Sequence, residues 1–592
     1  MRRAEPSARR AGPLAVAVLA LALGLSGCVR LPESGPVVQD DRVTPRDDAP
    51  GAFYVPSGPR PGESAADVVR HFMEAMTATP VQTGIAREFL ADEDAATWEP
   101  ERETLTYSGA LRPVARAGGS RVDVRLPDAN RLDRRGSWQG EVAAGAGELS
   151  FPMVREAGEW RIAEAPDALI VPEDWFENRF RAVSLYFFDP EAEILVPEPV
   201  FLPDGEQLAT TLVRRLVEGP GSGRADVSRS FLPREASLEM SVTVSAAGLA
   251  DVVLQGERAL PDEETLGLLL AQLAWTLRQD PAIEAFRVTL AGEPVRLADG
   301  SSEIPVEYGE EYSPSVSASS SRLFGLQDGL LVDVSPDEGV MPVRGAFGTS
   351  RYGLRDIAVD MTGDLVAGVT DDGATILLGG VDDDEQAVRP VLDGGEDLAE
   401  PSWDHAGRLW TLDRTAEGAR VVVVSGRDLR EVAVPGVTGR DVTDLQVSRD
   451  GSRLVAAVRG APGTSDRVVA HRVRYDRDGE VRAVTGGRLV LTGGEDPLRV
   501  IDLEWSEPTT IAVVERISRG IWTARLAPVD GSRPSTDDLP PASFDREPVR
   551  RVVAAPDDDL PTYLMTDSGT QLLGTPGTTD VPPDVVSLTY VG

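Results

Sequence analysis

The stretch Leu445-Gln446-Val447-Ser448-Arg449-Asp450-Gly451, followed by Leu454-Val455-Ala456-Ala457-Val458, predicts a strand, a tight Asp-Gly turn and a second strand. Matching strings occur 44 and 88 residues earlier, at 401–412 and 356–369. Weaker copies follow at 503–506 and 552–557. A strand–turn–strand unit that returns about every 44 residues has the length of one four-stranded propeller blade. The sequence therefore predicts that the C-terminal half of the chain is an all-β propeller.

The length of this region sets the size of the predicted propeller. Residues 313–592 divide into about six blades at the usual blade length, while five and seven remain open. The segment from Val585 to Val591 has strand character at the very end of the chain. We expect it to supply a closing strand to the first blade.

An α+β unit precedes the propeller, at 181–312. The segments 185–188 and 194–196 predict a hairpin, and Leu208 to Val217 predicts a helix that ends at Gly219-Pro220. Strands are expected near 238–244, 251–254 and 286–290, and a strong helix from Asp262 to Arg278. The buried stripe expected on that helix is Leu266, Leu269, Leu270, Leu273 and Leu277. This order resembles the GerMN domain, which implies a binding or assembly module without catalytic residues.

A first α+β unit is expected at 63–180. Apolar residues at helical spacing follow Ser64, a suitable N-cap, and a second helical stretch contains Ile85, Phe89 and Leu90. After Trp98-Glu99-Pro100 the pattern changes to strands near 121–126, 138–140, 149–154 and 159–162, which we expect to form one curved sheet. The arrangement resembles the nuclear-transport-factor-2-like (NTF2-like) fold, an α+β cone that often encloses a pocket.

The N-terminus has the pattern of a bacterial export signal. Four arginines precede the apolar run Leu14 to Leu25, which is too short to span a bilayer. The run ends in Leu25-Ser26-Gly27-Cys28, which resembles the lipobox of bacterial lipoproteins. We therefore expect residues 1–27 to be a signal peptide cleaved between Gly27 and Cys28. Cys28 would then carry the S-diacylglycerol and N-palmitoyl groups.

Two alternatives exist for this segment: a secretory signal with a chance cysteine, and a twin-arginine address. Cys28 is the single cysteine of the chain, which disfavours the first, and no polar-aromatic motif follows either Arg-Arg pair, which disfavours the second. Residues 28–62 are rich in Pro, Asp, Gly and Ser, and predict a disordered tether. The expected location is the extracytoplasmic face of the cell membrane.

Composition excludes several partner and cofactor classes. The formal net charge is -38 and the chain contains no lysine, so we expect no binding to nucleic acid. A single cysteine leaves no intramolecular disulfide, so the cores must be hydrophobic. We predict no cofactor.

The order of these parts resembles one family. The strings that carry the resemblance are Cys28 with Leu31-Pro32-Glu33-Ser34-Gly35-Pro36, the helix with Phe72-Met73-Glu74-Ala75-Met76, the segments 185–190, 195–197 and 271–277, and the propeller. Together they resemble LpqB, a family of actinobacterial lipoproteins linked to the MtrA–MtrB two-component system. The resemblance implies an accessory role beside the extracytoplasmic domain of the sensor kinase MtrB, affecting signalling, cell-wall homeostasis and cell division.

Residues that could support catalysis are few. The chain has three histidines, His71, His405 and His471, and we expect the first to be solvated and the other two to be structural or exposed. There is no G-x-S-x-G elbow, and without lysine there is no phosphate-binding G-x-x-x-x-G-K loop. No metal motif is present, because Asp476-Arg477-Asp478-Gly479 is an incomplete calcium loop, and the acidic runs 382–385 and 557–559 are typical of solvated loops.

We therefore predict a protein that is not an enzyme, with no catalytic, cofactor or metal residues. Two alternatives to a signalling partner stay open: an envelope glycan or ligand-binding lipoprotein, and a cryptic hydrolase. The 97 acidic residues could contain a pair of glycosidase carboxylates.

Overall fold

The computed structural model describes residues 54–592, except 117, 144, 222–226, 257–260, 316–320, 336–338, 384–386, 477–478, 494–496, 519, 535–546, 558–559, 574 and 580. These described residues belong to one unit of the chain, Tyr54–Gly592. The expected signal peptide, Cys28 and most of the expected tether lie outside the described residues. Tyr54 pairs with Thr79, and Gly62 N–H donates to Glu159 at 2.7 Å, so the chain already contacts the first domain before Glu63.

The first domain begins with helix α2 (Ala65–Ala75), which Ser64 caps by accepting from Asp67 N–H as expected. Its apolar face is buried, and Phe72 packs against Trp98 and Phe151 with ring centroids 5.5 and 6.0 Å apart. Short helical segments follow: α3 (Gly84–Arg87), α4 (Asp92–Thr97) and η1 (Pro100–Arg102). Helix α5 (Glu173–Glu177) closes the domain.

The strands of this domain form two four-stranded sheets, which corrects the expectation of one curved sheet. One has the order β5-β4-β1-β8 and the other β2-β3-β6-β7. A polar–apolar alternation tells which face of a strand is buried, but not which strand is its neighbour. The bounds are β1 Glu103–Tyr107, β2 Val114–Ala115, β3 Arg121–Arg125, β4 Asn130–Asp133, β5 Trp138–Glu141, β6 Glu148–Glu156, β7 Glu159–Ile162 and β8 Leu169–Pro172.

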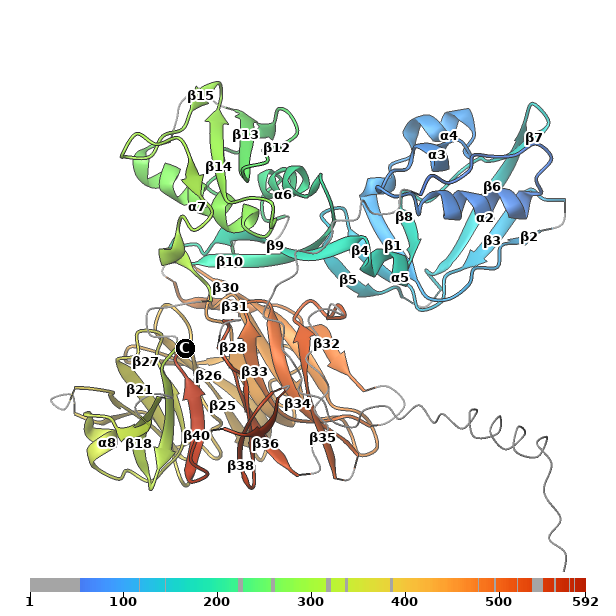
Figure 1. The fold of residues 1–592 in the computed structure, drawn as a ribbon. Coiled ribbons are helices and arrows are strands. Elements are labelled where there is room, and N and C mark those ends of the chain that lie inside the picture. Colours follow the sequence, from blue (N-terminus) through green and yellow to red (C-terminus); the bar gives the residue numbers. More distant parts are fainter. Residues whose placement is uncertain are drawn as a thin grey trace, which may run out of the picture. The chain divides into compact units, whose positions relative to one another are not determined.

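The second domain starts with the expected hairpin, β9 (Phe180–Phe188) and β10 (Leu195–Pro203), paired over nine residues. A mixed sheet has the order β11-β13-β14-β15, with β12 on β13 and β16 on β14. Helices α6 (Leu208–Val217) and α7 (Glu263–Leu277) pack against the hairpin (Figure 1). The strands are β11 Ser237–Leu238, β12 Thr243–Val244, β13 Leu249–Gln255, β14 Ala285–Leu290, β15 Glu293–Pro294 and β16 Ile304–Pro305, followed by η2 Glu310–Tyr312.

Helix α7 is buried on all sides along most of its length. Asp262 caps its start, and every residue from Leu268 to Leu277 is buried. The predicted leucine stripe therefore covers only part of the buried surface of the helix, because α7 contacts α6, β9 and β16. A helix that is apolar all round is the one expected between two layers.

Residues from Leu323 onwards form six antiparallel sheets, with the orders β19-β18-β17-β40, β20-β21-β22-β23, β24-β25-β26-β27, β28-β29-β30-β31 with β32 on β30, β33-β34-β35, and β36-β37-β38-β39. Their hydrophobic clusters combine residues of neighbouring sheets, as in the cluster that joins Trp410 and Val421 to Leu445 and Leu454. The sheets thus pack face to face as the blades of a propeller do.

The bounds of these strands are β17 Leu323–Gln327, β18 Leu330–Ser335, β19 Gly339–Pro342, β20 Leu354–Val359, β21 Leu365–Thr370, β22 Thr375–Gly380, β23 Arg389–Asp393, β24 Ser402–Trp403, β25 Arg408–Thr415, β26 Gly418–Ser425, β27 Asp428–Val432, β28 Val442–Val447, β29 Arg453–Val458, β30 Arg467–Tyr475, β31 Val481–Val484, β32 Arg488–Thr492, β33 Arg499–Glu507, β34 Thr510–Ser518, β35 Ile521–Pro528, β36 Val549–Val553, β37 Tyr563–Thr566, β38 Gly569–Leu572, β39 Thr575–Thr578 and β40 Val585–Tyr590. The short helix α8 (Ala346–Thr349) joins the first sheet to the second.

Two sequence expectations about this region are confirmed. Strand β40 pairs antiparallel with β17, so the C-terminus completes the first sheet (Figure 1). The turns of the 44-residue repeat contain glycines with φ of 77° at Gly363, 69° at Gly407 and 67° at Gly451. Only glycine adopts this left-handed conformation without steric cost, which explains why the turn pattern recurs in the sequence.

Candidate functional site

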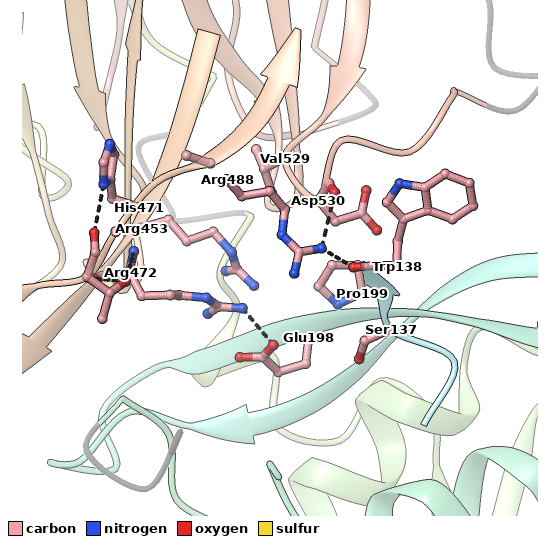
Figure 2. A pocket seen from close by; sticks show the side chains of 13 residues that line it. Ser137, Trp138, Glu198, Pro199, Arg453, His471, Arg472, Arg488, Val529 and Asp530 are labelled. Carbon is pink, nitrogen blue, oxygen red and sulfur yellow. Dashed lines mark hydrogen bonds and ion pairs between the residues drawn. The ribbon is translucent and has the colours of Figure 1, made fainter. Parts of the chain in front are cut away.

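A polar cavity of about 240 Å³ lies where the first domain, the second domain and the propeller meet (Figure 2). We call it the junction pocket. The first domain contributes residues of and next to β5, the second contributes residues of β10, and the propeller contributes β29, β30, β32 and the turn after β35. The lining residues are Ser137, Trp138, Glu198, Pro199, Arg453, Ala470, His471, Arg472, Thr485, Gly486, Arg488, Val529 and Asp530.

Three arginines of the propeller dominate this pocket. Arg453 donates to the carbonyl oxygen of Pro197, and Arg488 donates to the carbonyl oxygen of Trp138. Arg472 forms an ion pair with Glu198, with Nη2 and Oε2 2.6 Å apart. Figure 2 shows the three guanidinium groups directed toward the same space beside Glu198 and Pro199. Each arginine therefore both ties the propeller to another domain and lines the pocket.

The arginines are held in place from the propeller side. Arg453 is 2% exposed, and its Nη1 lies 3.3 Å from both Asp450 Oδ2 and Ser452 Oγ. Arg488 Nη1 also donates to the carbonyl oxygen of Asp530 at 3.3 Å. Charge-assisted hydrogen bonds of this kind fix the planar guanidinium group.

Asp530 is the second carboxyl group of the lining. Its side chain accepts from Ser532 N–H at 2.9 Å and from Ser532 Oγ at 2.6 Å. Burial nevertheless raises the pKa of Asp530 above its ordinary value, because desolvation outweighs these hydrogen bonds and the attraction of Arg488.

His471 forms one wall of the pocket and is 2% exposed. Its Nδ1 lies 2.8 Å from the carbonyl oxygen of Thr485, and burial lowers the pKa of His471. The ring is therefore neutral near pH 7, with the proton on Nδ1, because only a nitrogen that carries a proton can bond to a carbonyl. A Cβ at Gly487 would lie 2.7 Å from Nε2, so the glycine packs against that edge. His471 is a structural residue, as expected.

The other two histidines lie elsewhere. His405 Nε2 lies 3.4 Å from Asp189 Oδ2, which joins the propeller to the second domain. Burial opposes the charge on His405, but Asp189 and Asp404 outweigh it and raise the pKa of His405. His71 was expected to be solvated, but its Nδ1 lies 2.8 Å from Glu63 Oε1 and its side chain is 25% exposed. The sequence pattern did not reveal this contact, because Glu63 lies before α2 and eight positions from His71.

A ring of charged residues is the second polar cluster of the propeller. It consists of Asp356, Glu400, Asp444, Asp502, Glu504 and Arg551, on or next to the first strands of five sheets, which contact one another. A β-bulge lies directly before Asp356, Asp444, Asp502 and Arg551 in their strands. Bulges redirect a side chain at the rim of a sheet, and here they recur at one position of the repeat. We call these six residues the inner ring.

Hydrogen bonds in and beside the inner ring run from one sheet to the next. Asp444 accepts from Leu503 N–H at 3.2 Å, and Asp502 accepts from Val552 N–H at 2.8 Å. Arg551 donates to Asp356 at 2.5 Å and forms an ion pair with Glu400 at 2.9 Å. The ring thus ties neighbouring sheets together through side chains that sit near the axis.

Five carboxyl groups share one arginine in this ring, which affects their protonation. Burial raises the pKa of Glu400, Asp444, Asp502 and Glu504, and mutual repulsion adds to the effect for Glu504 and Asp502. In Arg551, burial is outweighed by Glu400, Asp356 and Asp502, so its pKa is raised. The carboxyl groups of the ring therefore hold their protons to higher pH than exposed carboxyl groups do.

The described residues contain no arrangement typical of a catalytic or metal site. The three histidines bond to Glu63, Asp189 and a backbone carbonyl, so none of them is paired with a hydroxyl nucleophile. In the part of the chain that the structure describes, no group of three or more His, Cys, Asp or Glu is placed to hold a metal ion. Asp382 of the acidic run pairs with Arg322 at 3.3 Å, whereas 384–385, 477–478 and 558–559 lie outside the described residues. None of the described helices has the length and apolar character needed to span a bilayer.

Comparison with known proteins assigns the chain to a family. Family models match in the same order as the domains: "Lipoprotein LpqB, N-terminal domain" over residues 58–177, "Sporulation and spore germination" over 184–296 and "Lipoprotein LpqB beta-propeller domain" over 329–573. Lipoprotein LpqB of Thermobifida fusca is 30% identical over 577 residues, which cover 88% of this chain and 90% of that protein. The chain belongs to the LpqB family. The resemblance inferred from the sequence is confirmed.

Other LpqB relatives and two solved structures are also similar. Lipoprotein LpqB of Rhodococcus jostii is 29% identical over 87% of both chains. TolB from Acinetobacter baumannii covers 53% of this chain and 85% of its own, with a TM-score of 0.31 and 12% identity. The first GerMN domain of GerM from Bacillus subtilis covers 21% of this chain and 97% of its own, with a TM-score of 0.18 and 20% identity. In sequence, this LpqB-family protein has the expected order of an α+β domain, a GerMN domain and a propeller.

Sequence reasoning identified neither the junction pocket nor the inner ring. The pocket arginines are ordinary members of strand patterns, and nothing local distinguishes Arg453 from a surface arginine. The inner ring left a detectable signal, because Asp356 and Asp444 lie exactly two repeats apart, just before matching apolar residues. An acidic residue that recurs at one position of a propeller repeat can therefore be found by aligning the repeats.

Proposed function

We propose that this LpqB-family lipoprotein acts as an accessory partner of the MtrA–MtrB two-component system. A lipid on Cys28 would hold it at the extracytoplasmic face of the cell membrane, where its folded domains contact the sensor domain of MtrB. Through that contact it would modulate signalling, cell-wall homeostasis and cell division. The observation that carries the proposal is the relationship to lipoprotein LpqB over 88% of the chain, together with the lipobox cysteine.

The domain architecture supports a binding role. We propose that the first domain is an NTF2-like cone and that the six sheets are the blades of one propeller. Both folds offer broad surfaces to a protein partner. A tether from Cys28 confines these surfaces near the membrane, which raises their effective concentration toward a membrane-embedded receptor. A weak interface would then be sufficient for regulation.

Photo-crosslinking in intact cells tests this proposal without deleting a domain. A crosslinking side chain would replace one exposed residue on each region: Val114 of the first domain, Met240 of the second, or Met341 and Leu429 of the propeller. We expect one region to capture MtrB and the others not to. Each variant keeps the whole chain, so a negative position serves as the control for a positive one.

The second measurement is the phosphorylation of MtrA in a strain that lacks this protein. We expect its level to change, and the wild-type gene to restore it. Unchanged phosphorylation together with no MtrB crosslink at any of the four positions would contradict the proposal and favour the envelope-ligand binder.

Peptide, ester and muropeptide substrates should be turned over only at background rates. A measurable rate that is lost on substituting one acidic residue would instead indicate a hydrolase.

A further inference from the structure

The junction pocket is rich in hydrogen-bond donors, although the chain as a whole is acidic. Arginine side chains have no acceptor atom, and three of them line the cavity. Two carboxyl groups face them: Glu198, which is 1% exposed, and Asp530, which is partly buried. The balance of charge in this pocket is therefore opposite to the net charge of -38 for the whole chain.

Two further donors of the lining lack an acceptor. The indole N–H of Trp138 and the hydroxyl of Ser137 are buried and make no hydrogen bond among the described residues. The two residues are 6% and 4% exposed. An indole N–H can only donate, and a buried donor without an acceptor costs free energy. In Figure 2 the nitrogen edge of Trp138 faces the side of the pocket where Arg488 and Asp530 lie.

We propose that the junction pocket is a binding site for a small phosphate-type oxyanion, and that its occupancy holds the three domains together. The unprotonated oxygen atoms of such an ion accept hydrogen bonds, which matches a lining of guanidinium, indole and hydroxyl donors. The volume of about 240 Å³ leaves room for a small organic group attached to the phosphate. The donors belong to the first domain and the propeller, and Pro199 of the second domain also lines the cavity, so one ligand would contact all three.

The oppositely charged partners Arg472 and Glu198 allow a test in which two substitutions should change the phosphate affinity in opposite directions. Removing the carboxylate with Glu198→Gln increases the positive charge around the cavity, so phosphate should bind more tightly. Removing the guanidinium with Arg472→Gln should weaken phosphate binding by about tenfold or more. A purely structural ion pair would destabilise the protein in both variants but would not shift phosphate affinity in opposite directions.

The experiment uses the full-length lipidated protein in detergent and inorganic phosphate as the probe. Isothermal titration calorimetry gives the affinity, at constant ionic strength maintained with chloride. Trp138→Phe keeps the ring but removes the N–H, and should also weaken binding. The matched control is Arg430→Gln, since Arg430 likewise donates to a backbone carbonyl at 2.8 Å and pairs with an acid at 3.3 Å, but is about half exposed and outside the pocket.

Hydrogen exchange provides the readout for the effect on the domains. Phosphate should slow exchange in β5 and β10, which face the propeller across the pocket, in the wild type but not in Arg472→Gln. The inference is overturned if the wild type shows no saturable binding at millimolar phosphate, if chloride has the same effect, or if Glu198→Gln and Arg472→Gln change the affinity in the same direction. Neither measurement requires MtrB. The phosphate-site inference is therefore tested independently of the proposed partner.

Discussion

Glu504 is the residue of the inner ring whose negative charge is least compensated by positive charge. Repulsion from Glu400 and Asp502 adds to the effect of burial on Glu504, and Arg551, which opposes it, is engaged with Asp356 and Glu400. A buried carboxylate among like charges favours its protonated form, which explains why the pKa of Glu504 is raised. Repulsion between the carboxylates of the inner ring therefore destabilises the folded protein, and this repulsion depends on pH.

We predict that Glu504→Gln stabilises the protein at high pH and leaves it unchanged at low pH. The folded protein binds a proton at Glu504 more tightly than the unfolded chain, so the free energy of unfolding of the wild type falls as pH rises from the ordinary glutamate range to the raised pKa. The variant lacks this loss and should therefore be more stable than the wild type at pH 8.

Denaturant unfolding at pH 5, 6.5 and 8 measures this difference. The control Glu417→Gln changes an exposed acid in a turn, and should stay within about 0.5 kcal/mol of the wild type at each pH. A difference for Glu504→Gln that shrinks as pH rises would show that the carboxylate is stabilised rather than strained.

Strand β40 is the element on which closure of the propeller depends. It lies more than 250 residues after its partner β17, and its buried residues pack with both the first and the last sheet. Leu588 is 1% exposed and shares a cluster with Val332 of the first sheet and Val553 of the last. The strand therefore joins the two ends of the propeller by hydrophobic contact as well as by hydrogen bonds.

We predict that Leu588→Ala lowers the free energy of unfolding by about 2–5 kcal/mol, because it leaves a cavity between the first and last sheets. Val586→Ala is the matched control on the same strand, since Val586 is 52% exposed and should change stability by about 0.5 kcal/mol or less. Thermal unfolding followed by calorimetry distinguishes them. Equal effects of the two substitutions would mean that packing of β40 between the first and last sheets does not stabilise the propeller.

For the molecule as a whole, charged side chains tie the propeller to the other two domains, whereas aromatic rings such as Phe176 and Phe201 join the first domain to the second. Arg453, Arg472 and Arg488 reach from the propeller to the other two domains, and His405 meets Asp189. Polar ties of this kind resemble transient interfaces, which can rearrange more readily than a shared hydrophobic core. The junction is therefore suited to a protein whose domains respond to a ligand or a partner.

Membrane attachment is the second property at this scale, and we expect it to depend on a single residue, Cys28. We predict that Cys28→Ser abolishes lipid labelling and leaves an unprocessed precursor, because no other thiol can accept the diacylglycerol. Metabolic labelling with a fatty acid and gel mobility measure the two effects. Normal cleavage and labelling of the substituted protein would contradict the lipobox interpretation.

The sequence by itself determined the order of the domains, the cap at Ser64, the helix that starts at Asp262, the 44-residue repeat and the closing strand at 585–591. These features are local, because a cap, a turn or a strand is specified by residues that are neighbours in the chain. Family membership followed from their order.

Only the tertiary structure decided the pairing of strands in the first domain, the partner of His405, the inner ring and the junction pocket. The contacts that make the pocket join residues 256 to 350 positions apart. An arginine has the same local pattern whether it faces solvent or a carbonyl of another domain, so its role depends on which surfaces pack together. Packing of the whole chain, rather than the local sequence, therefore created the candidate site.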